Sequence, residues 1–153
     1  MKNSILLILS LLACSCSCSR SADYDFFKTR GESDCISFSV DMNDTLYAYN
    51  MYILLRYNSF TQRESIPIEV TILSPTSVRA SETVTLPSSR NLLKKNKIKY
   101  SCGAGYYDVQ YSYREGIIPN ERGMWQISLT LPEDEKRVTG AGIITEKIPI
   151  IRK

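Results

Sequence analysis

The chain has 153 residues, of which 43% are hydrophobic and 23% are charged, and its net charge is +3. These proportions indicate one folded globular domain and exclude a disordered chain. The charge is too low to indicate nucleic-acid binding. The sequence has no histidine, which excludes Ser-His-Asp catalysis, Cys-His catalysis and histidine-bound zinc.

The N-terminus has the pattern of an export signal. Lys2 is followed by an apolar run over residues 5–12 that is too short to span a bilayer. The run ends in Leu11-Leu12-Ala13-Cys14, which resembles a bacterial lipobox, where the cysteine is acylated and becomes the new N-terminus. We therefore predict a signal peptide over residues 1–13 and lipid attachment at Cys14.

A flexible tether is predicted over residues 14–33, because this stretch begins rich in serine and lacks apolar periodicity. Cys16 and Cys18 do not have the leucine that stands three positions before Cys14, so Cys14 is the expected anchor. The folded domain is expected over residues 34–153. The aromatic residues expected to dock on it first are Tyr24, Phe26 and Phe27.

The rest of the chain is dominated by alternating apolar and polar residues, the pattern of half-buried strands. Because many short strands alternate with turns and no long amphipathic helix is found, we predict an all-β fold. The expected architecture is an antiparallel two-sheet β-sandwich, Ig-like or jelly-roll-like, whose strand order the sequence does not give. The strands are predicted over residues 36–42, 46–57, 66–72, 78–86, 97–102, 107–113, 124–131 and 139–148.

Two of these strands carry further information. Residues 46–57 are apolar on both faces near Ile53, which predicts a central strand covered on two sides. Pro67 lies near the start of its strand and predicts an edge strand or a first position, because proline cannot donate to a ladder. A turn is expected over residues 74–77.

Two cysteines lie within the domain, Cys35 and Cys102. One possibility is that in an oxidising compartment they form one disulfide that closes a long loop, which would contribute about 4 kcal/mol in the chain-entropy model. The alternative is a pair of buried free thiols. The sequence leaves both open.

Lysines are concentrated at one place in the chain, at Lys94, Lys95, Lys97 and Lys99. They are candidates for contact with membrane phosphates or with a partner. The alternative, which we favour, is a solvated loop that leads into a strand.

Two other residue types suggest binding. The chain has ten tyrosines, which suggest a sugar-binding platform, although tyrosine is also a favoured strand residue. Its acidic residues near turns lack the spacing of a calcium loop, so we expect turn capping and no metal site. These residues are Asp23, Asp25, Asp41 and Asp44.

The segment from Asp44 to Asn58, DTLYAYNMYILLRYN, resembles the gliding-motility lipoprotein GldH family of Bacteroidetes. Residues 138–147, VTGAGIITEK, are similar to the closing strand of that family, and residues 123–127 to its Gly-aromatic strand start. The chain departs from the family between Thr85 and Ile118. The resemblance implies a lipid-anchored accessory protein of the cell envelope, with no enzyme activity, no cofactor and no catalytic residue.

Three functions therefore follow as expectations. The first is a non-enzymatic lipoprotein of the cell membrane or outer membrane that binds envelope proteins. The second is a glycan-binding or ligand-binding lipoprotein for nutrient uptake, and the third is a hydrolase that uses only carboxylates. Because residues 15–22 contain no acidic run, we expect the periplasmic face rather than the cell surface.

Overall fold

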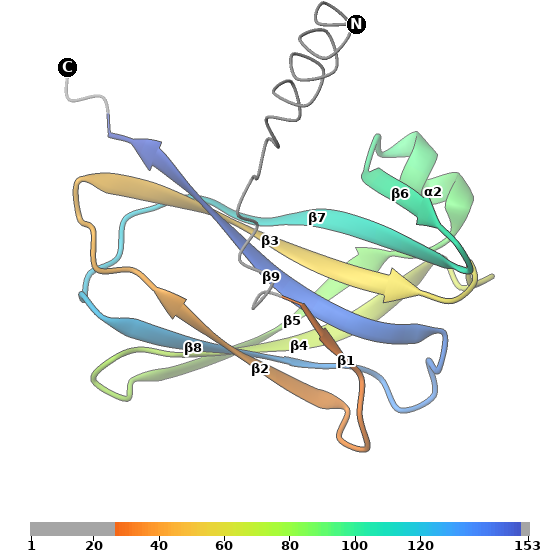
Figure 1. Ribbon diagram of the computed structural model, residues 1–153, viewed down its shortest axis with the longest axis horizontal. Helices are drawn as coiled ribbons and strands as arrows, with labels where there is room; N and C mark the ends of the chain where they lie inside the picture. Colours follow the sequence, from red (N-terminus) through yellow and green to blue (C-terminus); the bar gives the residue numbers. More distant parts are fainter. Residues whose placement is uncertain (1–26, 151–153) are drawn as a thin grey trace, which may run out of the picture.

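The computed structural model describes residues 27–150, which form a sandwich of two antiparallel β-sheets (Figure 1). The prediction of an all-β sandwich is confirmed. The predicted signal peptide, Cys14 and the aromatic residues Tyr24 and Phe26 lie outside the described residues. The strands are β1 (Phe27–Thr29), β2 (Cys35–Asp41), β3 (Tyr47–Tyr57), β4 (Ser65–Leu73), β5 (Arg79–Pro87), β6 (Lys99–Gly103), β7 (Tyr106–Ile117), β8 (Met124–Thr130) and β9 (Val138–Pro149).

One sheet has five strands in the order β1-β9-β3-β7-β6, and the other has four in the order β2-β8-β4-β5. All neighbours are antiparallel. The only helix among the described residues is α2 (Arg90–Lys95), between β5 and β6. No helix in residues 27–150 has the length and apolar character needed to cross a membrane.

The core lies between the sheets and follows from the alternation of each strand. In β2 every second residue is buried, and in β3 the buried positions run from Tyr49 to Tyr57. Because successive side chains point to opposite faces of a sheet, one side of each strand joins the core. The fully enclosed aliphatic side chains include Ile53, Leu55, Ile66, Ile68, Val70, Leu93, Val109, Ile127 and Leu129.

The prediction of a central strand over residues 46–57 is confirmed, because β3 lies between β7 and β9. Its outward-facing side chains, such as Tyr52, Leu54 and Arg56, are half-buried rather than exposed. The second face of this strand is therefore covered only in part.

Pro67 is the third residue of β4, which lies between β5 and β8 and is not an edge strand. The ladder with β8 covers only Glu69 to Leu73, so at Pro67 the neighbouring strand is β5 alone. The expectation of an edge strand was therefore wrong for β4 as a whole. Proline is tolerated here because β8 has already ended.

The expected tether over residues 14–33 overlaps the sheet, because β1 pairs with β9. A Cβ at Gly140 would lie 2.5 Å from Phe27 Cζ, so glycine at this position makes room for the phenyl ring. The Arg56 guanidinium stacks between the rings of Phe27 and Tyr106, at 4.4 and 4.1 Å from their centroids. Asp108 binds the same guanidinium through both carboxylate oxygens.

The loops gather at two opposite ends of the sandwich. We call the end with the β1–β2, β3–β4 and β8–β9 loops the β8–β9 end, on the right in Figure 1. The end with the β2–β3, β4–β5 and β7–β8 loops, on the left, is the β7–β8 end. The helix α2 lies toward the β8–β9 end, and β9 finishes at the β7–β8 end.

Candidate interaction surfaces

The lysine run forms the end of α2 and the start of β6. Ser89 caps the helix, accepting a hydrogen bond from the Leu92 N–H, and Leu93 is fully buried. At the other end Lys97 has φ 54°, and its N–H donates to the Lys94 carbonyl at 3.1 Å. The Ile98 N–H donates to the Leu93 carbonyl at 2.9 Å, which completes a Schellman motif.

This geometry gives the lysines a structural role. Lys94 and Lys95 lie in the last turn of α2, where cations complement the helix dipole. Lys97 occupies the left-handed position after the helix, and Lys99 opens β6. All four side chains are exposed. Contact with a membrane or a partner through them stays a prediction.

The expected disulfide is absent, since Cys35 and Cys102 are both free and both exposed. The alternative predicted two free thiols that are buried; the thiols are free, but the prediction that they are buried was wrong. Cys35 begins β2, an edge strand of the four-stranded sheet that lies against β9. Cys102 lies on β6, the edge of the five-stranded sheet farthest from β1. The two cysteines are therefore on different sheets and at different sides of the sandwich.

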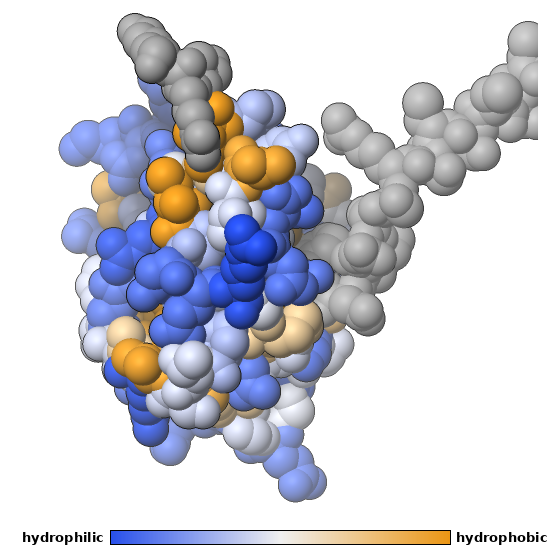
Figure 2. Space-filling model, turned by 90° about the vertical axis from the view of Figure 1, so that its left-hand side faces the viewer, coloured by the Kyte–Doolittle hydropathy of each residue, from blue (hydrophilic) through white to orange (hydrophobic). Residues whose placement is uncertain are grey.

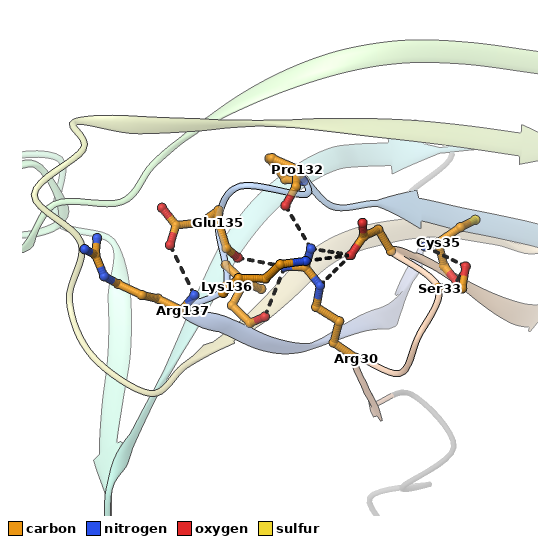
Figure 3. A network of polar contacts seen from close by, with 9 residues as sticks. Arg30, Ser33, Cys35, Pro132, Glu135, Lys136 and Arg137 are labelled. Carbon is orange, nitrogen blue, oxygen red and sulfur yellow. Dashed lines mark hydrogen bonds and ion pairs between the residues drawn. The ribbon is translucent and has the colours of Figure 1, made fainter.

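At the β8–β9 end, Arg30 joins two loops (Figure 3). Its side chain is 7% exposed and pairs with Asp34, with Nε 2.8 Å from the carboxylate. It also donates to the carbonyls of Glu135 at 2.7 Å and Pro132 at 2.9 Å. This guanidinium therefore ties the β1–β2 loop to the β8–β9 loop.

Glu135 joins a third loop to the same network. Its residue is 3% exposed, and its carboxylate accepts from Thr61 Oγ1 at 3.3 Å and from the Arg137 N–H at 3.2 Å. The Arg137 guanidinium donates to Thr61 Oγ1 at 2.7 Å. The buried carboxylate therefore fixes the β3–β4 loop against the β8–β9 loop.

A hollow of about 370 Å³ opens beside this network, lined by Gln62, Arg63, Asp134, Glu135, Lys136 and Arg137. The hydrogen bond between Arg63 and Asp134 lowers the pKa of the carboxyl and raises the pKa of the guanidinium. The charged groups that line the hollow bind one another and the loops around them. We therefore interpret these residues, together with Arg30, Asp34 and Thr61, as a clasp between the loops of the β8–β9 end. Sequence reasoning missed it because its residues come from segments far apart in the chain.

Three tyrosines of β7, Tyr107, Tyr111 and Tyr113, lie on its inner face, whereas Tyr106 lies on the outer face beside Arg56. Tyr111 is buried, its hydroxyl lies 3.1 Å from that of Tyr57, and it donates to the Pro87 carbonyl at 2.7 Å. Burial raises the pKa of Tyr111 to about 12. Tyr107 and Tyr113 are half-buried and pack against the core. The inner face of β7 therefore gives no support to the hypothesis of a sugar platform.

The acidic residues behave as turn caps. Asp41 Oδ1 accepts from the Asn43 N–H at 3.0 Å, and Asp44 Oδ1 accepts from the Leu46 N–H at 3.1 Å. Asp23 and Asp25 lie outside the described residues. Within residues 27–150, no group of three or more acidic or cysteine side chains is placed to hold a metal ion.

Comparisons with models of known protein families, with curated proteins and with solved structures found no match. The resemblance to the GldH family therefore rests on the sequence segments alone.

Proposed function

We propose that this chain is a non-enzymatic, lipid-anchored accessory protein of the bacterial cell envelope, related to the gliding-motility lipoproteins. The observation that carries the proposal is the sequence Leu11-Leu12-Ala13-Cys14 at the end of a short apolar leader. A polar spacer and a single β-sandwich follow it. The lipid holds the domain at a membrane, and the sandwich offers surfaces to envelope proteins.

The positions of the family-like segments support this proposal. Residues 44–58 contain β3, and residues 138–147 contain most of β9. These two strands are neighbours at the centre of the five-stranded sheet, with Ile53 opposite Ile143 and Leu55 opposite Ala141. The similarity thus falls on two strands that pack together, which favours a shared core over a chance likeness of separate segments.

The proposal is tested by removing the site of lipid attachment. Replacing Cys14 with serine should move the protein from the membrane fraction to the soluble fraction, because the acyl chains supply the membrane affinity. Cys16→Ser and Cys18→Ser are the matched controls and should leave the protein on the membrane. The mass of the N-terminal peptide should show an acylated Cys14. Retention of the Cys14→Ser protein at the membrane would refute the assignment.

The accessory role has a separate test. Affinity capture of the anchored protein from its native envelope should recover defined membrane proteins, and repeated recovery of none would contradict it. Protease treatment of intact cells should spare the domain if it faces the periplasm. Removal of the domain would place it on the cell surface.

The alternative function, a glycan-binding or ligand-binding lipoprotein, makes a different prediction. A ligand that binds the folded state should raise the unfolding temperature by mass action. A thermal-shift screen with oligosaccharides therefore separates it from the accessory role.

A further inference from the structure

Four large hydrophobic side chains are exposed on the sandwich, and all of them lie at the β7–β8 end. Leu46 is 69% exposed, Val78 64%, Ile118 60% and Met124 52%. Leu46 precedes the first residue of β3, and Ile118 follows the last residue of β7. Val78 lies in the turn before β5, and Met124 is the first residue of β8.

Hydrogen bonds join the three loops that carry or flank these residues. Arg122 of the β7–β8 loop donates to Thr45 of the β2–β3 loop at 2.9 Å. Thr76 of the β4–β5 turn donates to Glu121 of the β7–β8 loop at 2.7 Å. The three loops therefore hold one another in place and present the apolar side chains from a fixed platform.

Figure 2 looks onto this end and shows hydrophobic residues gathered in its upper part, with a smaller group lower down. Two charged side chains of this end have polar partners. Glu121 accepts from Thr76, and Lys147 lies 3.9 Å from Asp44. Exposed apolar side chains on neighbouring loops indicate an interaction surface.

The direction of the N-terminal chain relates this end to the anchor. β1 is antiparallel to β9, with Phe27 opposite Gly142 and Thr29 opposite Gly140, so the chain enters β1 from the side of the β7–β8 end. From Gly142, β9 extends about 24 Å further to Pro149 at that end. Residues 14–26 span at most about 45 Å. Cys14 can therefore lie in a membrane that touches the β7–β8 end.

We propose that the β7–β8 end docks on the lipid surface that holds the anchor, with Leu46, Val78 and Ile118 inserted among the lipids. This inference rests on the proposed lipid attachment. The alternative is docking through the lysine run at the end of α2 and the start of β6. The direction of β1 and the exposed apolar side chains favour the β7–β8 end.

The two docking modes differ in their dependence on salt. Insertion of apolar side chains is nearly insensitive to salt, whereas lysines bind anionic lipids through charges that salt screens. The single tryptophan of the chain, Trp125, is half-buried near the β7–β8 end and reports on its environment.

The experiment uses the acylated full-length protein in vesicles whose lipids carry bromine on their acyl chains. Docking should quench the fluorescence of Trp125, and high salt should leave the quenching unchanged. A variant with Leu46→Ser, Val78→Ser and Ile118→Ser should lose most of the quenching. The matched control with Lys94→Gln, Lys95→Gln, Lys97→Gln and Lys99→Gln should keep it.

Each contrary outcome overturns the inference. Acylated protein without quenching, or equal quenching in the serine variant, excludes insertion of this end. Loss of quenching in the lysine control would show that docking of this end depends on the charges of the lysine run. If the serine variant instead loses a captured envelope protein while the parent shows no quenching, the surface binds protein. The mass of the N-terminal peptide, measured on the same sample, separates these results from a failure of lipid attachment.

Discussion

Arg30 shows how one side chain can determine the arrangement of an end of the sandwich. Its guanidinium is nearly buried, pairs with Asp34 and donates to two carbonyls of the β8–β9 loop. A planar fork of donors can satisfy three acceptors that lie in different directions, which a lysine ammonium on a flexible stem does less well. Geometry rather than charge alone therefore explains an arginine at this position.

We predict that Arg30→Gln lowers the free energy of unfolding by about 3 kcal/mol, because the Asp34 carboxylate loses its partner and carbonyls are left unpaired. Arg30→Lys keeps the charge and should cost less, about 2 kcal/mol. Urea denaturation measures both. Glu133→Gln, an exposed change in the β8–β9 loop, is the control and should stay within about 0.5 kcal/mol of the parent. Parent-like stability of Arg30→Gln would contradict the role of the clasp.

The raised pKa values of Tyr111 and Tyr113 predict how stability depends on high pH. Burial raises the pKa of Tyr111 to about 12; burial, together with the hydrogen bond to Glu82, raises the pKa of Tyr113 to about 12. In the unfolded chain these hydroxyls ionise near pH 10. The unfolded state therefore holds fewer protons above pH 10, and stability must fall as pH rises from 10 to 12.

Urea midpoints measured from pH 9 to 12 test this prediction. The stabilising contribution is fully present below pH 10 and is lost as pH approaches 12. Tyr111→Phe should make the decline shallower, even though the variant starts from a lower stability because it loses the hydrogen bond to the Pro87 carbonyl. Stability that stays level or rises over this range would show that the tyrosines titrate freely.

At the scale of elements, Gly140 allows β1 to join the sheet. A Cβ there would lie 2.5 Å from Phe27 Cζ and 2.9 Å from the Lys28 carbonyl oxygen, and backbone cannot move aside cheaply. We predict that Gly140→Ala displaces β1 and costs about 1–3 kcal/mol.

Urea denaturation and limited proteolysis within residues 27–30 measure this effect. Gly31→Ala is the matched control, because nothing lies within 4 Å of a Cβ at Gly31. Equal stability and equal protease resistance of the two alanine variants would show that β1 is not held by this contact.

Most strands were predictable from the sequence because one face of each is buried. The alternation of apolar and polar residues shows this burial directly in three strands. Examples are Ile36 and Ser37 in β2, Ile68 and Glu69 in β4, and Ile127 and Ser128 in β8. β1 was not predictable, since three residues are too few for a period. It exists because of contacts with Gly140 and Arg56, which are distant in the sequence.

The lysine run illustrates a second limit. The sequence showed the charges but not the helix, because α2 is short and depends on burial of Leu93 and on the hydrogen bond from Ile98 back to its carbonyl. Such short helices are marginal without packing. The favoured interpretation of a solvated loop was therefore wrong for Lys94 and Lys95, which lie in α2, whereas Lys99 does open a strand as expected.

For the molecule as a whole, the fold class was predictable but the strand order was not. Every strand carries a similar alternation, so the pattern does not say which strand pairs with which. The clasp at the β8–β9 end was hidden for the same reason, because Arg30, Thr61 and Glu135 meet only once the sheets are in place. Polar side chains join the loops at both ends, but the large exposed apolar side chains of residues 27–150 lie at the β7–β8 end.

The sandwich holds its two sheets together without a covalent bridge in the described residues, which gives a last prediction. A bond between Cys35 and Cys102 would cross from the edge of one sheet to the edge of the other, and a closed loop of this length would contribute about 4 kcal/mol.

Because both thiols are free and exposed, reducing agent should leave the urea midpoint unchanged. Both cysteines should also react with an alkylating reagent in the folded protein, as identified by peptide mapping. Cys35→Ser with Cys102→Ser should be as stable as the parent, since the cohesion of the sheets comes from the buried apolar core between them. A midpoint that falls on reduction, together with protection of both thiols from alkylation, would show instead that a covalent link supplies part of that cohesion.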